Sequence, residues 1–409
     1  MTSDHRGWQD NANGGAVSAT ICAVIAVGYA AQASSLSAAF EAACDRTPEI
    51  QALIARRAVP LAKRMAAGAR LPGGPWATFT HRTDALTHDR GTREYVAELT
   101  LPVWLRGERG AVLNAALTEG ERIEAEITFR RLELARRVRD AFWLVVEARE
   151  KGAVADRRRA TATALLQDVR GQAQSGQTGT IEAKLAAADI GDAEAALAGR
   201  KAELKQAEIA FRVLTGREPP AMYNEKDAGR ATTRSHPRIA LRGSILQKAE
   251  ADQTLVLTMD RERPEVGAFV SNAQDTSAEP NVTSLGVRLK IPFAYDAINR
   301  PKRAAAAADV VAAQEELSLA EREVAGDVAQ ARVKLAGARQ QFAALEGRRT
   351  GLAEVVQLTQ AGQRAGQIPL NELIRSRLQL FEADLARATA MVAAQRARSD
   401  LNQALGLEP

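Results

Sequence analysis

Aromatic residues are scarce in this chain of 409 residues: Phe, Trp and Tyr together make up only 4% of it. Such side chains usually fill a large globular core, so the sequence does not predict one. Hydrophobic residues still account for 46% of the chain and charged residues for 26%, which is enough apolar material for folding. The abundant residues are Ala, Arg, Leu and Glu, a composition that favours long helices.

Cysteine and histidine are also rare. The two cysteines are Cys22 and Cys44, and Cys22 lies in a segment that we expect to be removed, which argues against an internal disulfide. The histidines are scattered, and none has another at metal-ligand spacing, which argues against a transition-metal site built on histidine. They are His5, His81, His88 and His236.

Several functional signatures are missing. The net charge of +5 is small, and no basic block is interleaved with aromatic residues, so nucleic-acid binding is not expected. The sequence contains no Ser/His/Asp or Cys/His constellation, no phosphate-binding loop and no cluster of metal ligands. We therefore predict that the protein is not an enzyme and uses no cofactor.

The N-terminus carries an apolar run at residues 16–31, followed by Ala31-Gln32-Ala33. Small residues at the first and third of those positions suit signal peptidase, and the run is short for a membrane span. We predict a signal peptide over residues 1–33. The alternative is an N-terminal anchor, because Arg6 is offset by Asp4 and Asp10 in an unusually long preceding segment.

The chain contains a tandem repeat with an offset of about 190 residues. Four landmarks recur at 190 or 189 residues: Pro102 with Pro292, Gly176-Gln177 with Gly366-Gln367, Gly216 with Gly406, and Pro48 with Pro237. They predict a first repeat at 34–216, a linker at 217–235 with Pro219-Pro220, and a second repeat at 236–409.

Each repeat has the same predicted order of elements. A helix (Leu36–Ala69 or Pro237–Arg261) precedes two strands, near 75–104 in the first repeat and 264–293 in the second. Two long helices follow, at 106–172 and 178–213, then at 302–361 and 370–405; the first would measure roughly 100 Å. Heptad spacing, as at Ile374, Leu378, Phe381 and Leu385, predicts helices packed side by side.

The strands alternate in polarity. Apolar residues take every odd position from 285 to 293, and Arg288 and Lys290 lie between them; in the matching run Glu98 and Thr100 oppose an apolar face. Phe79 and Phe269 occupy equivalent positions of the noisier partner strands. One face suits lipid and the other suits a wet lumen formed by Glu98, Thr100, Arg288 and Lys290. A soluble β-layer is the alternative.

Four strands cannot enclose a pore, so we expect identical copies to assemble. Three copies would supply twelve strands, three times four, and twelve long helices. The predicted fold class is mainly α with a small β part: a tandem-repeat protomer of a trimeric twelve-stranded β-barrel, continued by a twelve-helix α-barrel.

This order of elements resembles the TolC family of outer-membrane efflux proteins over essentially the whole mature chain. The opening helix SLSAAFEAACDRTPEIQALIARR (Ser35–Arg57) and the last helix RAGQIPLNELIRSRLQLFEADLARA (Arg364–Ala388) are similar to those of the family. The stretches ARLPGGP (Ala69–Pro75) and LTLPVWLRGERGAVLNAA (Leu99–Ala116) are similar to its CzcC-like metal-efflux branch.

The resemblance implies a homotrimer in outer-membrane lipid of a Gram-negative cell, with a periplasmic extension. It also implies docking to a periplasmic adaptor and an RND-type inner-membrane pump, and passive export, with heavy-metal cations as the leading substrate. Multidrug or solvent efflux and type I protein secretion are alternatives within the family. A periplasmic coiled-coil scaffold or an adaptor protein is the alternative of another class.

The resemblance also implies a periplasmic gate, where acidic residues after the turn form a cation-binding ring. Glu372 falls at the first acidic position, Arg375 replaces the second, and Glu182 is the repeat equivalent of Glu372. A solvated acidic residue at a helix start is the alternative. The turns with Gly176-Gln177 and Gly366-Gln367 are the expected adaptor contacts, although a turn that merely reverses the chain would look the same.

Overall fold

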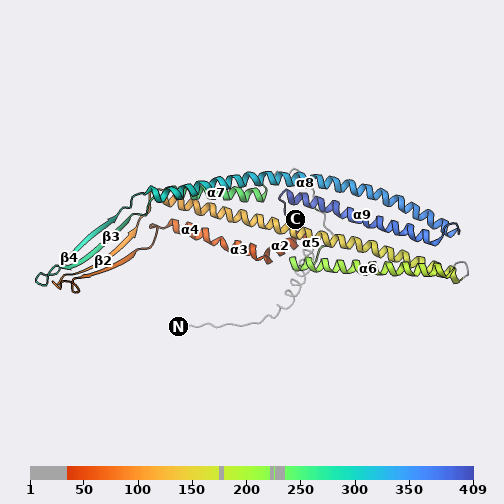
Figure 1. The fold of residues 1–409 in the computed structure, drawn as a ribbon, viewed down its shortest axis with the longest axis horizontal. Helices are drawn as coiled ribbons and strands as arrows, with labels where there is room; N and C mark the ends of the chain where they lie inside the picture. The colour runs from red at the N-terminus through yellow and green to blue at the C-terminus, as the bar shows by residue number, and fades with distance from the viewer. Residues whose placement is uncertain (1–34, 175–178, 222–224, 226–234) are drawn as a thin grey trace, which may run out of the picture. The chain divides into compact units, whose positions relative to one another are not determined.

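A computed structural model describes residues 35–174, 179–221, 225 and 235–409. The predicted signal peptide, Cys22, Gly176, Gln177 and most of the predicted linker lie outside these residues. The described chain is mainly helical with one small sheet, which confirms the predicted fold class for a single copy (Figure 1).

The helices and strands follow one another in the order helix, two strands, two long helices, and then repeat that order. The first repeat contains α2 (Leu36–Arg46), α3 (Pro48–Arg56), α4 (Ala58–Gly68), β1 (Trp76–Thr83), β2 (Arg93–Pro102), α5 (Glu108–Gln174) and α6 (Thr180–Thr215). The second contains α7 (Pro237–Thr258), β3 (Glu265–Gln274), β4 (Val282–Lys290), α8 (Asp296–Arg364) and α9 (Leu370–Ala404).

The chain divides into two compact units, which do not coincide with the two repeats. One unit contains α2, α6, α9 and the later parts of α5 and α8, from Glu133 and Gln330 onward. The other contains α3, α4, α7, all four strands and the earlier parts of α5 and α8. Each unit therefore combines matching pieces of both repeats.

The four strands of the second unit form one antiparallel sheet in the order β1-β2-β3-β4. Two hairpins, one from each repeat, meet where β2 pairs with β3, from Arg93 opposite Gln274 to Pro102 opposite Glu265. The outer strands β1 and β4 are the two edges of this sheet.

The junctions between the short and the long helices are built alike in both repeats. Arg109, at the start of α5, donates to the carbonyl oxygens of Ala67 (2.8 Å) and Gly68 (2.9 Å) at the end of α4. Its repeat equivalent Asn299, near the start of α8, donates to the carbonyl of Asp260, just past α7. Polar side chains thus satisfy carbonyl groups that a helix end leaves without partners.

The side chain of Glu108 connects the two repeats near the start of α5. Its carboxylate is completely buried and accepts a hydrogen bond from Nε of Arg263 at 2.7 Å, and Nη2 of the same guanidinium lies 2.6 Å away in an ion pair. It also accepts the backbone N–H of Leu105 at 2.9 Å, at the N-terminus of α5. A buried charge needs such partners, and this one fixes α5 to the segment that enters β3.

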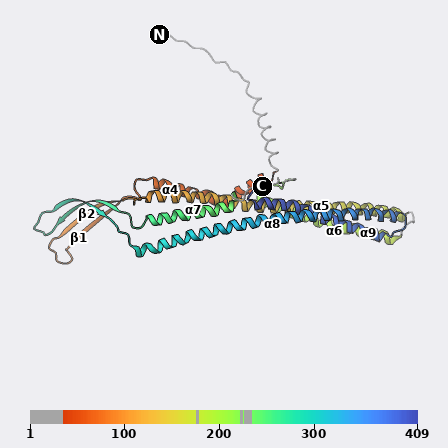
Figure 2. The same cartoon turned by 90° about the horizontal axis from the view of Figure 1, so that it is seen from above.

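In the unit that contains α2, which we call the helical unit, the pair of α5 and α6 and the pair of α8 and α9 lie side by side (Figures 1 and 2). Near the end of α5 and the start of α9, the helices α5, α6 and α9 share one apolar cluster, formed by Leu165, Leu166, Val169, Ala186, Leu370 and Leu373. The antiparallel contact of α5 with α9 continues at Asp140, which pairs with Arg396 at 2.6 Å.

Two of the glycine landmarks terminate helices. Gly216 and Gly406 both adopt the left-handed conformation, with φ of 71° and 80°. Gly406 donates to the carbonyl of Gln403, and Leu407 donates to that of Asn402, which is the Schellman pattern. The repeat landmark reflects a backbone conformation that favours glycine.

The opening helix differs between the repeats. In the second repeat it is the single helix α7, whereas the expected helix over Leu36–Ala69 is divided into α2, α3 and α4. Thr47 is extended (φ −83°, ψ 113°) because it precedes Pro48, and Pro48 has no N–H with which to continue α2.

Candidate functional site

The sheet has two chemically different faces. Because directly opposed residues share a face, the pairing places the predicted lumen residues Glu98, Thr100, Arg288 and Lys290 together on one face. We call it the polar face. That it lines a lumen stays a prediction.

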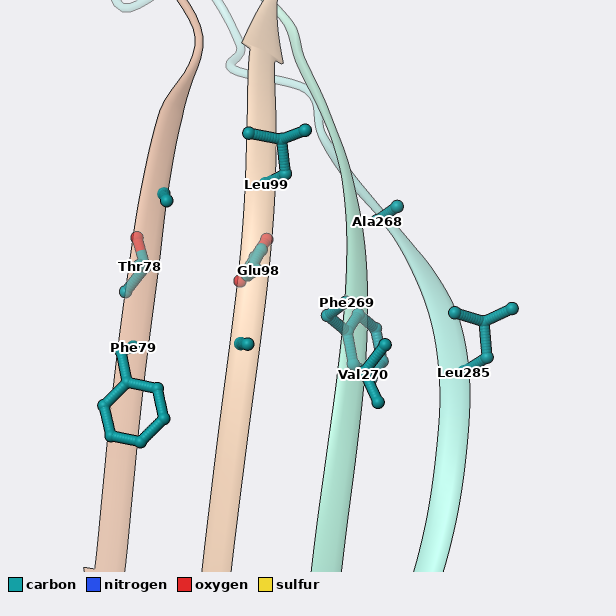
Figure 3. A pocket seen from close by; sticks show the side chains of 10 residues that line it. Thr78, Phe79, Glu98, Leu99, Ala268, Phe269, Val270 and Leu285 are labelled. Carbon is teal, nitrogen blue, oxygen red and sulfur yellow. The ribbon is translucent and has the colours of Figure 1, made fainter.

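The opposite face is largely apolar and exposed over all four strands, and its polar residues, such as Arg93 and Gln274, lie at the loop end; we call it the apolar face. A shallow hollow lies on it (Figure 3), and Phe79 and Leu285, on its two edge strands, are 70% and 81% exposed. So many exposed apolar side chains on one face are typical of a surface covered by lipid or by another protein. The face comprises Phe79, Tyr95, Leu99, Val266, Val270, Leu285, Val287 and Leu289.

An ion pair between Glu98 and Arg288 lies at the centre of the polar face. Nη1 of Arg288 on β4 lies 2.5 Å from Oε2 of Glu98 on β2, so the pair crosses the intervening strand β3. Thr100 donates from its hydroxyl to Oε1 of Glu98 at 3.4 Å. Glu98 is buried, whereas Arg288 is 60% exposed.

Two glycines make room for this pair. A Cβ atom on Gly267 of β3 would lie 2.7 Å from Oε1 of Glu98 and 3.1 Å from the hydroxyl of Thr100. A Cβ atom on Gly286 of β4 would overlap the ring of Phe269, coming within 2.6 Å of Cε1. The same ring lies below the guanidinium of Arg288, 5.6 Å from its centroid, in a cation–π contact.

The remaining charges of the polar face are paired as well. Nζ of Lys290 lies 3.1 Å from Oε1 of Glu265 and 3.7 Å from Glu262. Nε of Arg82 lies 3.6 Å from Oε2 of Glu94. Every charged residue of the polar face within the four strands therefore has a partner of opposite charge on another strand.

Phe79 and Phe269 lie on opposite faces, although they are 190 residues apart. Phe79 is opposite Ala97, on the apolar face, whereas Phe269 is opposite Glu98 and Gly286, on the polar face. The segment from Pro264 to Phe269 is one residue longer than that from Pro75 to Phe79, and a shift of one residue moves a side chain to the other face.

The loop between β1 and β2 is organised by Asp84. Partial burial acts to raise the pKa of its carboxyl group, but hydrogen bonds from the backbone N–H groups of Arg90 and Thr92 outweigh it and lower the pKa. The hydroxyl of Thr92 donates to the carbonyl of Asp275 at 2.9 Å, so the loops of the two hairpins are in contact.

The predicted gate residues lie at the end of the helical unit where α8 turns into α9; we call it the turn end. Glu372 is in the first turn of α9 and Glu182 is in the first turn of α6. Arg375 is exposed, and its Nη1 lies 3.4 Å from Oε1 of Glu372, which partly neutralises that carboxylate. Their role as a gate stays a prediction.

The turn between α8 and α9 is a tight Schellman motif. Gly366 has φ of 73° and donates to the carbonyl of Gln363, and Gln367 donates to that of Gly362. Ile368 packs on Gly362, where a Cβ atom would meet its Cδ1 at 2.6 Å. The matching residues Gly176 and Gln177 lie outside the described residues, and adaptor contact at either turn stays a prediction.

Sequence reasoning did not identify the partners of the predicted lumen residues. It missed the Glu98–Arg288 ion pair, the role of Gly267, and the pairs made by Glu265 and Glu94. The separation of 190 residues between Glu98 and Arg288 was an available signal, because equivalent residues of two adjacent hairpins lie at similar heights in one sheet.

No group of three or more His, Cys, Asp or Glu side chains is arranged to hold a metal ion in the described part of the chain. None of its described helices combines the length and the hydropathy of a membrane span.

Comparison with known proteins gives both sequence and structural relatives, although no family model matches the chain. The chain is 25% identical over 215 residues to the cobalt-zinc-cadmium resistance protein CzcC of Cupriavidus metallidurans. The alignment covers 50% of this chain and 51% of CzcC, so the chain spans about half the length of the curated relative that it matches.

The structural relatives include outer-membrane proteins. VceC of Vibrio cholerae matches with a TM-score of 0.71 and 14% identity, over 91% of this chain and 96% of VceC. The open-state outer membrane channel MtrE of Neisseria gonorrhoeae matches with a TM-score of 0.69 and 18% identity, over 91% and 88%. A membrane protein of Pseudomonas aeruginosa matches with 0.72 and 17%, over 91% and 93%.

These likenesses confirm the resemblance stated from the sequence. The chain has the fold of the outer-membrane channels, and it is similar in sequence to CzcC.

Proposed function

We propose that this chain is one protomer of a homotrimeric outer-membrane channel that serves as a passive exit duct. The observation that carries the proposal is the sheet with one largely apolar, exposed face and one charged, internally paired face. Lipid on the first face and water on the second satisfy both surfaces.

Assembly follows from the strand count. The sheet ends at β1 and β4, whose outer edges carry unpaired backbone groups within the single chain. Pairing β4 of one copy with β1 of the next would satisfy both edges, and three copies would close a ring of twelve strands, three times four. The same assembly would place three copies of the helical unit around one axis.

The proposed cargo follows from the name of the curated relative. CzcC is named for resistance to cobalt, zinc and cadmium, so we propose heavy-metal cations as the exported substrate. A duct has no energy source of its own; an inner-membrane pump would deliver the cations, and a periplasmic adaptor would bind the turns that include Gly366 and Gln367.

The turn end would also hold the gate. Three copies would bring six carboxylates, from Glu182 and Glu372, to one end of the duct. Within each chain, Arg375 already pairs with Glu372 at 3.4 Å. The ring would therefore attract cations less strongly than one made of carboxylates alone.

Fractionation of cells tests the channel assignment. The protein should be found in the outer-membrane fraction and migrate as a trimer in detergent gels until it is heated. A coiled-coil scaffold would instead be found, without detergent, in the soluble periplasmic fraction. Deletion of the gene should sensitise cells to cobalt, zinc or cadmium; sensitivity to drugs alone would favour multidrug export.

A further inference from the structure

The charges of the polar face are balanced in number. The four strands carry three cationic side chains on this face, Arg82, Arg288 and Lys290, and three carboxylates, Glu94, Glu98 and Glu265. Each cationic side chain lies within 4.0 Å of one of these carboxylates. The face therefore has no net charge, although it is rich in ionised groups.

The cationic and the anionic side chains of these pairs differ in their exposure. In the pair of Arg288 and Glu98 the side chains are 60% and 7% exposed. In the pair of Lys290 and Glu265 they are 53% and 23% exposed, and in the pair of Arg82 and Glu94 they are 70% and 33% exposed. In all three pairs the cationic group covers the carboxylate, so guanidinium and ammonium groups are outermost.

The central pair is built into the sheet. It needs the missing side chains of Gly267 and Gly286, and the ring of Phe269 supports the guanidinium from below. Exposed surface ion pairs usually lack such support and are only loosely held. Arg288 is therefore fixed over Glu98.

We propose that, because a cationic side chain covers each of these carboxylates, the sheet part of the duct neither attracts nor retains the cations that pass through it. The inference rests on the proposed function, since it requires the polar face to line the lumen. Bare carboxylates in a narrow pore attract cations and slow their exit, whereas conduction requires weak binding. Arg288 and Lys290 are thus determinants of ion selectivity at the sheet, independent of the turn end.

Reversal potentials in a KCl gradient, measured on the purified full-length trimer in planar bilayers, test this proposal. Arg288→Gln should raise the permeability ratio of K⁺ to Cl⁻ by about twofold, since it leaves Glu98 without its cap. Glu98→Gln should lower the ratio, because it leaves an unpaired guanidinium. The double variant should return close to the original value. Ser284→Gln, a neutral change on the same face, is the matched control and should leave the ratio unchanged.

Lys290→Gln provides an independent arm if either central variant does not assemble, because Lys290 is exposed and lies away from the glycines. It should also raise the ratio. If the assembled variants conduct with the original ratio, the pairs only brace the sheet and the inference is wrong, while the channel assignment stands. If the folded trimer does not conduct at all, the proposed function fails, and this inference fails with it.

Discussion

Glu98 and Arg288 occupy equivalent positions of the two repeats, 190 residues apart, and form an ion pair of 2.5 Å across the strand that separates them. Equivalent positions of the two hairpins thus carry opposite charges, and this ion pair connects the hairpins. The pair marks the polar face of a sheet whose other face is apolar and exposed.

The middle of the apolar face should tolerate no charge. Leu285→Lys places an ammonium group on that face, where a lipid-facing cation costs about 2–4 kcal/mol per copy near the bilayer centre. We expect most of this variant to be missing from the outer-membrane fraction. Ser284→Lys adds the same charge one residue earlier, on the polar face, and should insert normally. Equal insertion of the two variants would contradict the assignment of the faces.

Replacing Gly286 even by alanine should destabilise the protein. In Gly286→Ala the new Cβ would overlap the ring of Phe269, and overpacking of this kind costs about 1–3 kcal/mol. The temperature at which the trimer dissociates in detergent should fall. The added change Phe269→Ala should recover part of the loss, whereas Gly110→Ala, at a helical site with no atom within 4 Å, should be neutral or stabilising. An unchanged dissociation temperature for Gly286→Ala would contradict this packing.

Arg139 connects three segments of the helical unit. It is only 3% exposed, and its guanidinium donates to Gln403 Oε1 at 2.5 Å, to the carbonyl of Leu407 at 2.9 Å and to the carboxylate of Glu225. Arg139→Met leaves the carboxylate of Glu225 buried without its partner, which costs about 3–5 kcal/mol.

Thermal unfolding followed by circular dichroism measures this loss. The double variant Arg139→Met/Glu225→Gln should be more stable than Arg139→Met alone, because it removes the unpaired charge. A single variant as stable as the original protein would show that the cluster adds nothing to stability.

Stability should also depend on pH through His236. This residue caps α7 by accepting the N–H of Arg238 at Nδ1. Burial lowers the pKa of its imidazole, and nearby Arg238 lowers it further, although Asp327 acts in the opposite direction. The folded state thus favours the neutral ring, while the unfolded chain binds a proton near pH 6.5.

The free energy of unfolding should therefore decrease as the pH falls below about 6.5. His236→Asn keeps a capping acceptor without a titrating group, so its loss of melting temperature between pH 7 and pH 5 should be smaller. The same pH dependence in both proteins would exclude His236 as its source.

The turn end should influence ion selectivity through Glu372. Glu372→Lys should lower the preference for cations in planar bilayers, and Arg375→Gln should raise it, because that change removes the partner that neutralises Glu372. The two variants alter opposite charges at one place, so shifts in the same direction would contradict the assignment. Unchanged selectivity in both would remove Glu372 from the gate.

Much of the fold could be predicted because its signals are periodic. Heptad spacing predicted the long helices, and alternation at 285–293 predicted a sheet with two unlike faces. The Gly216 and Gly406 landmarks set only the repeat offset; that both end helices with left-handed backbone is a finding of the structure. The mainly-α fold class is confirmed, and so is the resemblance to outer-membrane channels.

What could not be predicted depends on contacts between distant residues. The one-residue difference before Phe269 reverses its face, which a repeat offset alone does not reveal. The Arg139–Glu225 pair joins a long helix to the linker, and no local pattern predicts it. Pro48 was a visible signal for the break after α2, although the repeat suggested one continuous helix. The roles of the lumen, gate and turn residues stay predictions.

Conductance of the purified protein tests the central claim most directly. Reconstituted into planar bilayers, the detergent-purified trimer should produce discrete, stable ion-conducting steps without any pump or energy source. A folded protein that is monomeric in buffer without detergent, and that produces no conductance, would contradict the account.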